Sequence, residues 1–242
     1  MTDLKGRVAL VTGGSRGIGR AIAISLAEAG AAVAVNYRSR EHDARHVVEA
    51  IHATGGRAMP VCADVSQSVQ VHEMLAAVQR ALGPVDVLVN NAGIGLVRTV
   101  DELTEEDFDR TIAVNLKSVF LCTQAVVPGM QTRQWGRIVN ISSGAARGAG
   151  GVGPHYNASK AGLEGMTRGY AARLVKDGIT VNAVAPSLIE TDMVGAVASS
   201  AARIPLGRFG TPEECAQVVM MLVGNAYMTG QTVALSGGLS FL

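Results

Sequence analysis

The chain has 242 residues and a nearly balanced charge, with 21 Lys and Arg against 20 Asp and Glu for a net charge of +1. This balance argues against a general binder of nucleic acid or of membrane surfaces, because such proteins usually carry a basic excess. With 48% hydrophobic residues and only 17% charged ones, the chain can bury a sizeable core, which excludes intrinsic disorder.

The sequence also bears on the cellular compartment. It contains no uninterrupted apolar run of about 18 residues, so no membrane span is expected. Its start lacks the basic and then apolar layout of a signal peptide. The cysteines Cys62, Cys122 and Cys215 are widely spaced and form no C-x-x-C pair, so neither a disulfide scaffold nor a zinc site is expected. The prediction is a cytoplasmic protein.

Short apolar runs alternate with longer amphipathic segments along the whole chain. Buried strands are predicted at residues 7–12, 32–37, 57–62, 85–89, 137–142, 179–184 and 232–235. Helices are predicted at residues 17–30, 40–54, 66–82, from Thr104 onward, 156–176 and 211–224, the last opening with a Thr-Pro-Glu-Glu capping pattern. Unbroken apolar strands that alternate with helices indicate a parallel sheet covered on both faces. The predicted fold class is α/β, a Rossmann-type doubly wound sheet of about seven strands in a single domain over residues 1–242.

A glycine-rich turn joins the first predicted strand to the first helix. Residues 12–19 read T-G-G-S-R-G-I-G, so the glycines follow the spacing G-x-x-x-G-x-G instead of the general dinucleotide fingerprint G-x-G-x-x-G. Glycines let the backbone turn sharply and approach a pyrophosphate, and the N-terminus of the next helix offers unpaired N–H groups to phosphate oxygens. The place of this turn between a strand and a helix favours a dinucleotide site over a glycine-rich turn without a ligand.

The end of the second strand bears on which dinucleotide is bound. Many NAD sites place an acidic residue there, on the ribose 2′-hydroxyl. This chain has no acid until Glu41, and Arg38 together with Arg16 of the glycine-rich turn could pair with a 2′-phosphate. The alternative is two solvated arginines at a helix start. NADP(H) is predicted in preference to NAD(H).

Four further features follow the glycine-rich turn in order: Asn-Asn-Ala-Gly at residues 90–93, Asn115, Ser143, and Tyr-Asn-Ala-Ser-Lys at residues 156–160. Together they resemble the short-chain dehydrogenase/reductase family over essentially the whole chain. Within that family the sequence is most similar to the bacterial 3-oxoacyl-acyl-carrier-protein reductases, through residues 15–23, residues 189–193 and the closing glycines Gly230, Gly237 and Gly238.

The resemblance implies a catalytic set of Asn115, Ser143, Tyr156 and Lys160. Tyr156 and Lys160 are four residues apart, so they share one face of a helix. A nearby ammonium favours a phenolate, so Lys160 is expected to lower the pKa of Tyr156, the general acid in reduction. Ser143 would hydrogen-bond the substrate oxygen. Lys160 would also hold the nicotinamide ribose, and Asn115 would steady a water-linked proton relay to it.

The resemblance also implies which residues bind the dinucleotide. They are Gly13, Ser15, Arg16, Gly17, Ile18, Gly19, Tyr37, Arg38, Ser39, Asp64, Val65, Asn91, Ala92, Gly93, Tyr156, Lys160, Pro186, Ser187, Ile189 and Thr191. No metal site is predicted, since His42 and His46 share a helix face without a third ligand. His155 is expected at the rim of the pocket, either tuning substrate preference or simply packing.

Three departures from the family pattern bear on the substrate. Ser187 replaces the usual glycine beside the nicotinamide, where it would add a contact or crowd the site. The lid segment at residues 194–204 is short and rich in Ala, Ser and Gly, typical of a mobile flap. Where carrier-protein reductases have basic docking residues this chain has Gln134 and Asp177, with Arg133 and Lys176 one position earlier.

The leading prediction is an NADPH-dependent reductase of ketone carbonyls, acting on 3-oxoacyl thioesters in fatty acid biosynthesis, with acyl carrier protein as a possible partner. The alternatives are an alcohol, sugar (glucose-dehydrogenase-like) or small-ketone dehydrogenase that uses the same residues, and a non-catalytic dinucleotide-binding sensor. The resemblance further implies a homotetramer, built through the two long middle helices and the last strand. Neither nucleic acid nor a membrane is an expected partner.

Overall fold

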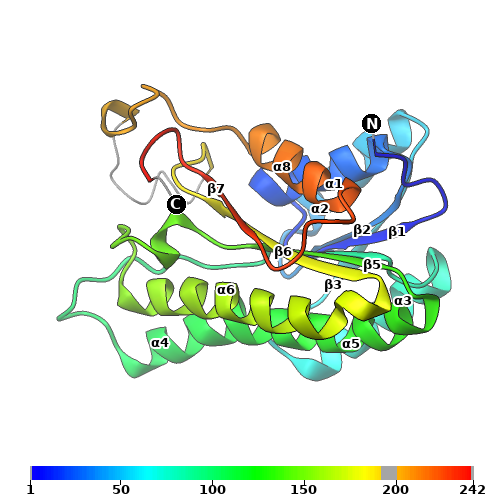
Figure 1. Cartoon of the computed structure of the whole chain (residues 1–242), viewed down its shortest axis with the longest axis horizontal. Coiled ribbons are helices and arrows are strands. Elements are labelled where there is room, and N and C mark those ends of the chain that lie inside the picture. The colour runs from blue at the N-terminus through cyan, green and yellow to red at the C-terminus, as the bar shows by residue number, and fades with distance from the viewer. Residues whose placement is uncertain (1, 192–200, 241–242) are drawn as a thin grey trace.

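The computed structural model describes residues 2–191 and 201–240. Seven parallel strands form one sheet in the order β3-β2-β1-β4-β5-β6-β7 (Figure 1). The strands are β1 (Val8–Val11), β2 (Ala32–Tyr37), β3 (Arg57–Cys62), β4 (Val87–Asn90), β5 (Gly136–Ile141), β6 (Ile179–Pro186) and β7 (Thr232–Leu235). The chain runs outward from β1 to β3, then returns to place β4 on the other side of β1. The predicted doubly wound α/β fold is confirmed.

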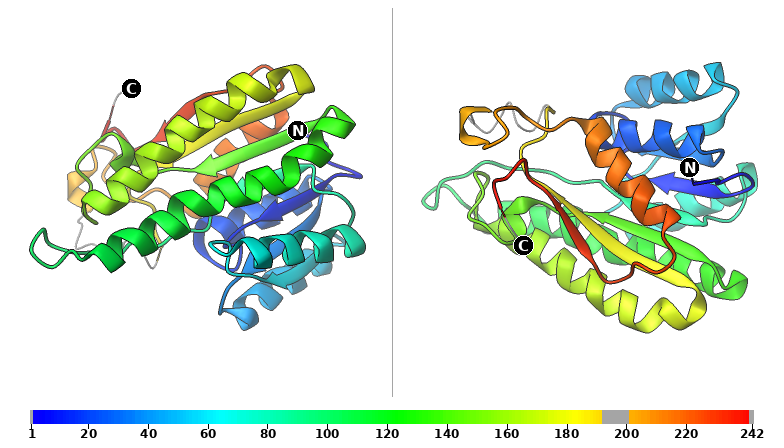
Figure 2. Two further views of the ribbon diagram at one scale, coloured as in Figure 1. Left: turned by 90° about the horizontal axis from the view of Figure 1, so that it is seen from below. Right: turned by 45° about the horizontal axis from the view of Figure 1, so that its top comes forward.

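Helices cover both faces of this sheet, as two views of the ribbon show (Figure 2). The helices are α1 (Gly17–Glu28), α2 (Glu41–Ala53), α3 (Ser68–Ala81), α4 (Glu105–Ile112), α5 (Ser118–Arg133), α6 (Pro154–Leu174) and α8 (Pro212–Gly224). One core cluster packs α1, α2 and α8 on one face, and a second packs α3, α5 and α6 on the other. Every residue of β1, β4, β5 and β6 is buried, which is why these strands read as unbroken apolar runs.

Local sequence signals account for some of the helix ends. At α8 the Thr211 hydroxyl accepts from the Glu214 amide, and the Glu214 carboxylate accepts from the Thr211 amide, so the expected capping box is present. The catalytic-region helix α6 begins two residues before the predicted start because Pro154 occupies its first turn. It ends at Leu174 and continues only as a 3-10 turn over Val175–Asp177.

A long helical stretch, Glu105–Arg133, joins α4 and α5 through a π-helical segment over Ala113–Lys117. It is the one stretch in the described residues whose length and mean hydropathy of 1.3 would suit a membrane span. Cys122, Val126 and Met130 on its α5 part are buried in the core cluster beneath the sheet. One side of the stretch is therefore packed in the protein core.

Candidate active site

A cleft of about 540 Å³ opens where the carboxyl ends of the strands meet, on both sides of the β1–β4 junction. This is the point at which strand order reverses, where open α/β sheets bind their ligands. The cleft wall contains every residue that the sequence assigned to the dinucleotide, from Gly13 to Thr191. It also contains Ser143, so the motifs spread over the whole chain are brought to one site.

The glycine-rich turn forms the floor of this cleft. Gly13 has φ +61°, a left-handed conformation that favours glycine. A Cβ on Gly19 would overlap the carbonyl oxygen of Gly13, so α1 can begin this close to the turn only with a glycine there. The side-chain amide nitrogen of Asn91 donates to the carbonyl oxygens of Thr12 and Gly13, both at 2.9 Å, and fixes the turn. The free N-terminus of α1 thus lies in a cradle that fits a pyrophosphate.

The far end of the cleft, beyond β2 and β3, carries Tyr37, Arg38, Ser39, Asp64 and Val65. The Arg38 guanidinium lies 3.8 Å from the Asp64 carboxylate, at a half-exposed position. The Asp64 carboxylate also accepts from the amide and hydroxyl of Ser66, at 2.9 and 2.7 Å, and so shapes the turn after β3. An arginine therefore lines this end of the cleft.

Asn36, which sequence reasoning missed, connects these two regions. Its buried side chain accepts from the Gly13 amide at 3.1 Å and donates to the carbonyl oxygens of Val61 and Ala63. The signal was an amide inside an otherwise apolar strand, since a buried polar group requires partners. Other lining residues outside the sequence-based set are Arg40, Ala63, Ile94, Val114, Ile141, Ser142 and Glu190.

Tyr156 and Lys160 project from the start of α6 into the opposite end of the cleft, beside Ser143 at the end of β5. Tyr156 is 7% exposed, and its burial raises the pKa of the phenol, which a hydrogen bond with Ser143 partly offsets. The Lys160 ammonium donates to the Ile141 carbonyl oxygen at 2.7 Å and lies 5.7 Å from the centre of the Tyr156 ring. Burial lowers the pKa of Lys160 to about 8.

The expectation that Lys160 lowers the pKa of Tyr156 is therefore wrong for the protein without ligand. The loss of hydration around the phenol outweighs any attraction from the ammonium, which itself is held toward the Ile141 carbonyl oxygen. The phenol is protonated near neutral pH, which suits a proton donor.

Asn115 lies behind the reacting groups, not on the cleft wall. It sits in the π-helical segment and is fully buried. Its amide oxygen accepts from the Ile94 amide at 2.8 Å, and its nitrogen donates to the Ile94 carbonyl oxygen and to the Ser159 hydroxyl. π-helical segments occur frequently at functional sites. Here the segment ties the loop after β4 to the helix that carries Tyr156 and Lys160.

Two further residues lie beside the catalytic set. His155 is 1% exposed and does not line the cleft, and its Nε2 lies 3.0 Å from the Leu96 carbonyl oxygen, so of the two alternatives for this residue the structure favours packing over a place at the pocket rim. Ser187 does line the cleft, and its Oγ lies 2.5 Å from where a Cβ on Gly144 would stand. The hydroxyl thus rests against the turn that follows Ser143. Of the predicted lid, residues 194–200 lie outside the described residues.

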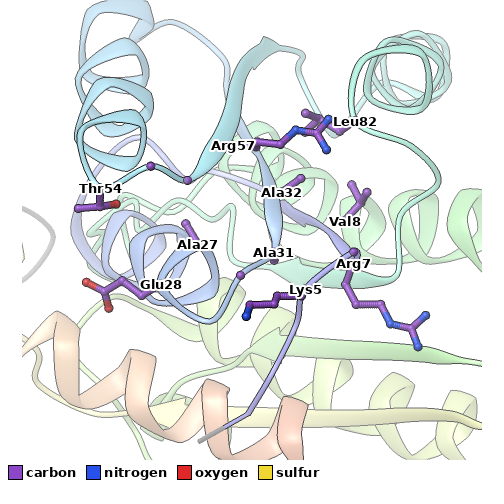
Figure 3. A pocket seen from close by; sticks show the side chains of 14 residues that line it. Lys5, Arg7, Val8, Ala27, Glu28, Ala31, Ala32, Thr54, Arg57 and Leu82 are labelled. Carbon is purple, nitrogen blue, oxygen red and sulfur yellow. The ribbon is translucent and has the colours of Figure 1, made fainter.

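A second hollow, of about 500 Å³, lies at the amino ends of β1, β2 and β3 (Figure 3). The charged ends of Arg7, Glu28 and Arg57 on its wall point in different directions. Arg7 is engaged elsewhere, 3.7 Å from Asp86 and stacked 3.9 Å from the centre of the Trp135 ring. No charged groups converge there on a common point, so the candidate site is the cleft at the carboxyl ends.

No cluster of three metal-ligating side chains occurs among the residues that the structure describes. The tilted rings of His42 and His46 lie with their centres 4.1 Å apart on the exposed side of α2, and the Nδ1 of His42 lies 3.9 Å from the Asp43 carboxylate.

The fold and site define a dinucleotide-binding oxidoreductase of the Rossmann type. The sequence model described as short chain dehydrogenase matches residues 7–202, and the chain belongs to this family. Membership of this family indicates that the protein is an oxidoreductase that acts on CH–OH or C=O groups.

Three relatives show how far the similarity extends. A 3-oxoacyl-[acyl-carrier-protein] reductase of Staphylococcus epidermidis is 43% identical over 240 residues, covering 96% of this chain and 98% of the relative. The enzyme of the same name from Thermotoga maritima is 42% identical, with 98% of both chains covered. A gluconate 5-dehydrogenase of Burkholderia cenocepacia, solved with NADP and tartrate, is 34% identical with a TM-score of 0.91, covering 98% of this chain and 96% of the other.

Proposed function

We propose that the protein is an NADPH-dependent reductase that converts the 3-keto group of a 3-oxoacyl thioester to a hydroxyl. The observation that carries this proposal is the arrangement of Ser143, Tyr156 and Lys160 at one end of a cleft whose other end fits a dinucleotide. The reductases that are 42–43% identical over nearly the full chain supply the substrate class.

The nicotinamide group supplies the hydride when the dinucleotide is bound. The chain's own residues then handle the substrate oxygen and a proton. The Ser143 and Tyr156 hydroxyls hold the carbonyl oxygen, and the Tyr156 hydroxyl gives it a proton as negative charge develops. The raised pKa of Tyr156 keeps this proton in place near neutral pH, and Lys160, with a pKa of about 8, can exchange protons in the same range. A protonated Tyr156 is the form that donates the proton in reduction.

The preference for NADPH rests on the arginines at the far end of the cleft. Among the described residues, the charged partner of Arg38 is Asp64 at 3.8 Å, a long contact at a half-exposed position. A phosphate on the ribose 2′-hydroxyl would give this guanidinium a stronger, charge-assisted hydrogen bond. Arg16 also lines the cleft, from the glycine-rich turn.

The charge at the catalytic end supports an uncharged keto group over an aldonate. Among the described residues there, Lys160 supplies the positive charge, and its ammonium is buried and bonded to the Ile141 carbonyl oxygen. Glu190 adds a carboxylate to the same wall. A sugar acid such as gluconate would therefore meet no exposed cation among these residues, whereas a thioester needs none.

Docking of an acyl carrier protein has weaker support than reduction of the thioester itself. The Arg133 guanidinium donates to the Asp86 carboxylate at 3.1 Å and to the Val85 carbonyl oxygen at 2.7 Å. Asp177 accepts from the Gln131 amide. Because Arg133 is engaged within the chain, the proposal concerns the acyl thioester, and a carrier-bound substrate is a separate arm of the test.

The proposed setting is a homotetramer in the cytoplasm. Phe108 on α4 and Phe120 on α5 are 43% and 45% exposed, and such side chains suit a subunit interface. Light scattering after size-exclusion chromatography measures the mass. A monomer would rule the tetramer out.

The decisive experiment measures NADPH oxidation against four substrates: an acetoacetyl thioester of a small thiol, the same acyl group on acyl carrier protein, a simple ketone, and 5-ketogluconate. The proposal expects the highest kcat/KM among the thioesters. Faster reduction of the keto acid would replace the proposal with a sugar-acid dehydrogenase. Binding of NADPH without any turnover would favour the non-catalytic sensor.

A further inference from the structure

A buried carboxylate that the proposed chemistry does not use lies one helical turn beyond Lys160. Glu164 is 4% exposed on α6. One of its oxygens accepts from the Ser142 hydroxyl at 3.2 Å, and the other accepts from the Arg147 guanidinium at 2.8 Å. A buried carboxylate costs free energy unless it is paired and hydrogen-bonded, so these two contacts are what allow it to stay charged.

Both partners of Glu164 belong to the segment that carries Ser143. Ser142 directly precedes it, and Arg147 follows four residues after it. The Ser142 hydroxyl also lies 3.4 Å from the Lys160 carbonyl oxygen, and the Lys160 ammonium donates to the carbonyl oxygen of Ile141. The segment is thus attached to α6 on both sides of Ser143.

The turn between these attachments is internally braced and would move as a unit. The Ser143 hydroxyl accepts from the Ala145 amide, and the Ala146 amide donates to the Ser143 carbonyl oxygen at 2.9 Å. The Gly148 amide donates to the Gly144 carbonyl oxygen at 3.1 Å. The Asn157 side chain on α6 also donates to the carbonyl oxygens of Gly148 and Ala149, at 2.9 and 2.8 Å, so the Arg147 end of the turn has two attachments to this helix. Loss of the Arg147 attachment is therefore expected to loosen Ser143 relative to Tyr156, which α6 itself carries.

We propose that Arg147 and Glu164 are positioning residues, an ion pair that holds the Ser143 hydroxyl in register with the Tyr156 hydroxyl. Neither residue of the pair lines the cleft, so the pair acts through the turn that it fastens to α6. This inference uses the proposed function only in taking Ser143 and Tyr156 as the groups that hold the reacting oxygen. It applies to whichever carbonyl substrate the enzyme reduces.

The chain offers a matched control for the test at the amino ends of the strands. Asp86 is likewise 4% exposed and accepts from the Arg133 guanidinium, far from the cleft. Arg147→Met and Arg133→Met each remove the arginine from a buried carboxylate while keeping much of its apolar length. Both are expected to lower the melting temperature, because each removes the arginine that donates to a buried carboxylate. Asp86 keeps Arg7 at 3.7 Å and the Val8 amide at 3.1 Å, so the smaller decrease is expected for Arg133→Met.

Activity separates the two variants. Arg147→Met is expected to lower kcat about 10- to 100-fold, as a small misplacement of a reacting group does. Its Kd for NADPH, measured by fluorescence titration, is expected to stay within about twofold, or RT ln 2, because Arg147 does not line the cleft. Arg133→Met should keep kcat unchanged. Equal kcat for both variants and wild type would overturn the proposal.

A double substitution tests whether the effect runs through Ser143. In a Ser143→Ala background the turn has no hydroxyl to position, so Arg147→Met should cause little further loss of kcat. A full additional loss there would overturn the proposal, because the pair would then act by another route. If Arg147→Met does not fold, Glu164→Gln takes its place, since the amide oxygen can still accept from the Ser142 hydroxyl.

The substrate panel keeps this test separate from the proposed function. If acetoacetyl thioesters are not reduced, that function fails, and the same variants are then compared on the carbonyl compound that gives the highest rate. An enzyme that reduces the thioester but shows unaltered kcat in Arg147→Met and Glu164→Gln leaves the function standing and removes the positioning pair.

Discussion

The amino ends and the carboxyl ends of the strands, called below the amino edge and the carboxyl edge of the sheet, contain similar groups in different arrangements. Each has a hollow of comparable size, about 540 Å³ at the carboxyl edge and about 500 Å³ at the amino edge. Each also has a buried carboxylate, Glu164 or Asp86, that accepts from an arginine. At the amino edge Arg7, which lines the hollow, is paired with Asp86. At the carboxyl edge the hydroxyls and the ammonium of the catalytic set line an open cleft. Size of a hollow and burial of charge alone therefore do not mark the site.

The largest expected effect of any single change tests whether that cleft is a reaction centre. Tyr156→Phe removes the hydroxyl that protonates the substrate oxygen and keeps the ring. We expect kcat to fall about a thousandfold, within the range for loss of a general acid. The NADPH titration should stay close to wild type. Retained turnover in the variant would show that another group donates the proton.

Lys160 allows a test by stability measurements, because it is the one buried ammonium of the catalytic set at the carboxyl edge. Its pKa falls from 10.5 to about 8 on folding, so burial of the charge lowers the free energy of unfolding below about pH 8. This destabilisation disappears as the pH rises from 8 to 10.5. Lys160→Met should therefore raise the stability of the protein near neutral pH by up to roughly 3 kcal/mol, less about 1 kcal/mol for the lost hydrogen bond.

Thermal unfolding of both proteins across pH 7–11 measures this difference. The stability advantage of Lys160→Met should shrink steadily between pH 8 and 10.5, and the variant should lose turnover. A constant difference over that pH interval would show that the ammonium is not destabilised by burial.

Arg38→Ala tests the other end of the cleft. Loss of a hydrogen bond to a charged group costs about 1.5–3 kcal/mol, so the Kd for NADPH should rise about 10- to 100-fold. The Kd for NADH, which lacks the 2′-phosphate, should change little. Arg45→Ala is the control, since Arg45 pairs with Glu41 on an exposed helix face. Equal weakening of both dinucleotides would assign Arg38 a structural role.

Ser187 and Gly144 allow a pairwise test beside the reacting groups. A Cβ on Gly144 would stand 2.5 Å from the Ser187 hydroxyl oxygen, so Gly144→Ala must displace either this hydroxyl or the turn after Ser143. We expect kcat/KM to fall about tenfold, and the same change in a Ser187→Gly background to cost much less. Independent effects of the two substitutions would mean that the Ser187 hydroxyl does not press on this turn.

Some features of the fold and the site can be predicted from local sequence patterns, whereas others depend on contacts between residues that are distant in the sequence. The apolar runs, the glycine-rich turn and the Thr211 cap are local patterns, and the structure has all of them. The pairing of Arg147 with Glu164 is not local, because it joins residues 17 positions apart on a turn and a helix. The direction of the Tyr156 pKa shift was wrong for the same reason, since the burial that raises it depends on neighbours from several segments.

The smallest expected effect belongs to the amino edge. Arg7→Ala removes a guanidinium stacked on Trp135 and a long contact to Asp86. Because the side chain is 36% exposed, a cation–π contact and a screened ion pair together are worth only about 1 kcal/mol. Asp86 keeps its contacts to Arg133 and to the Val8 amide, so its charge stays compensated. Urea denaturation should show this modest loss while kcat and the Kd for NADPH stay unchanged. A change in either constant would make the hollow at the amino ends a ligand site coupled to the cleft, and the two edges would no longer differ in kind.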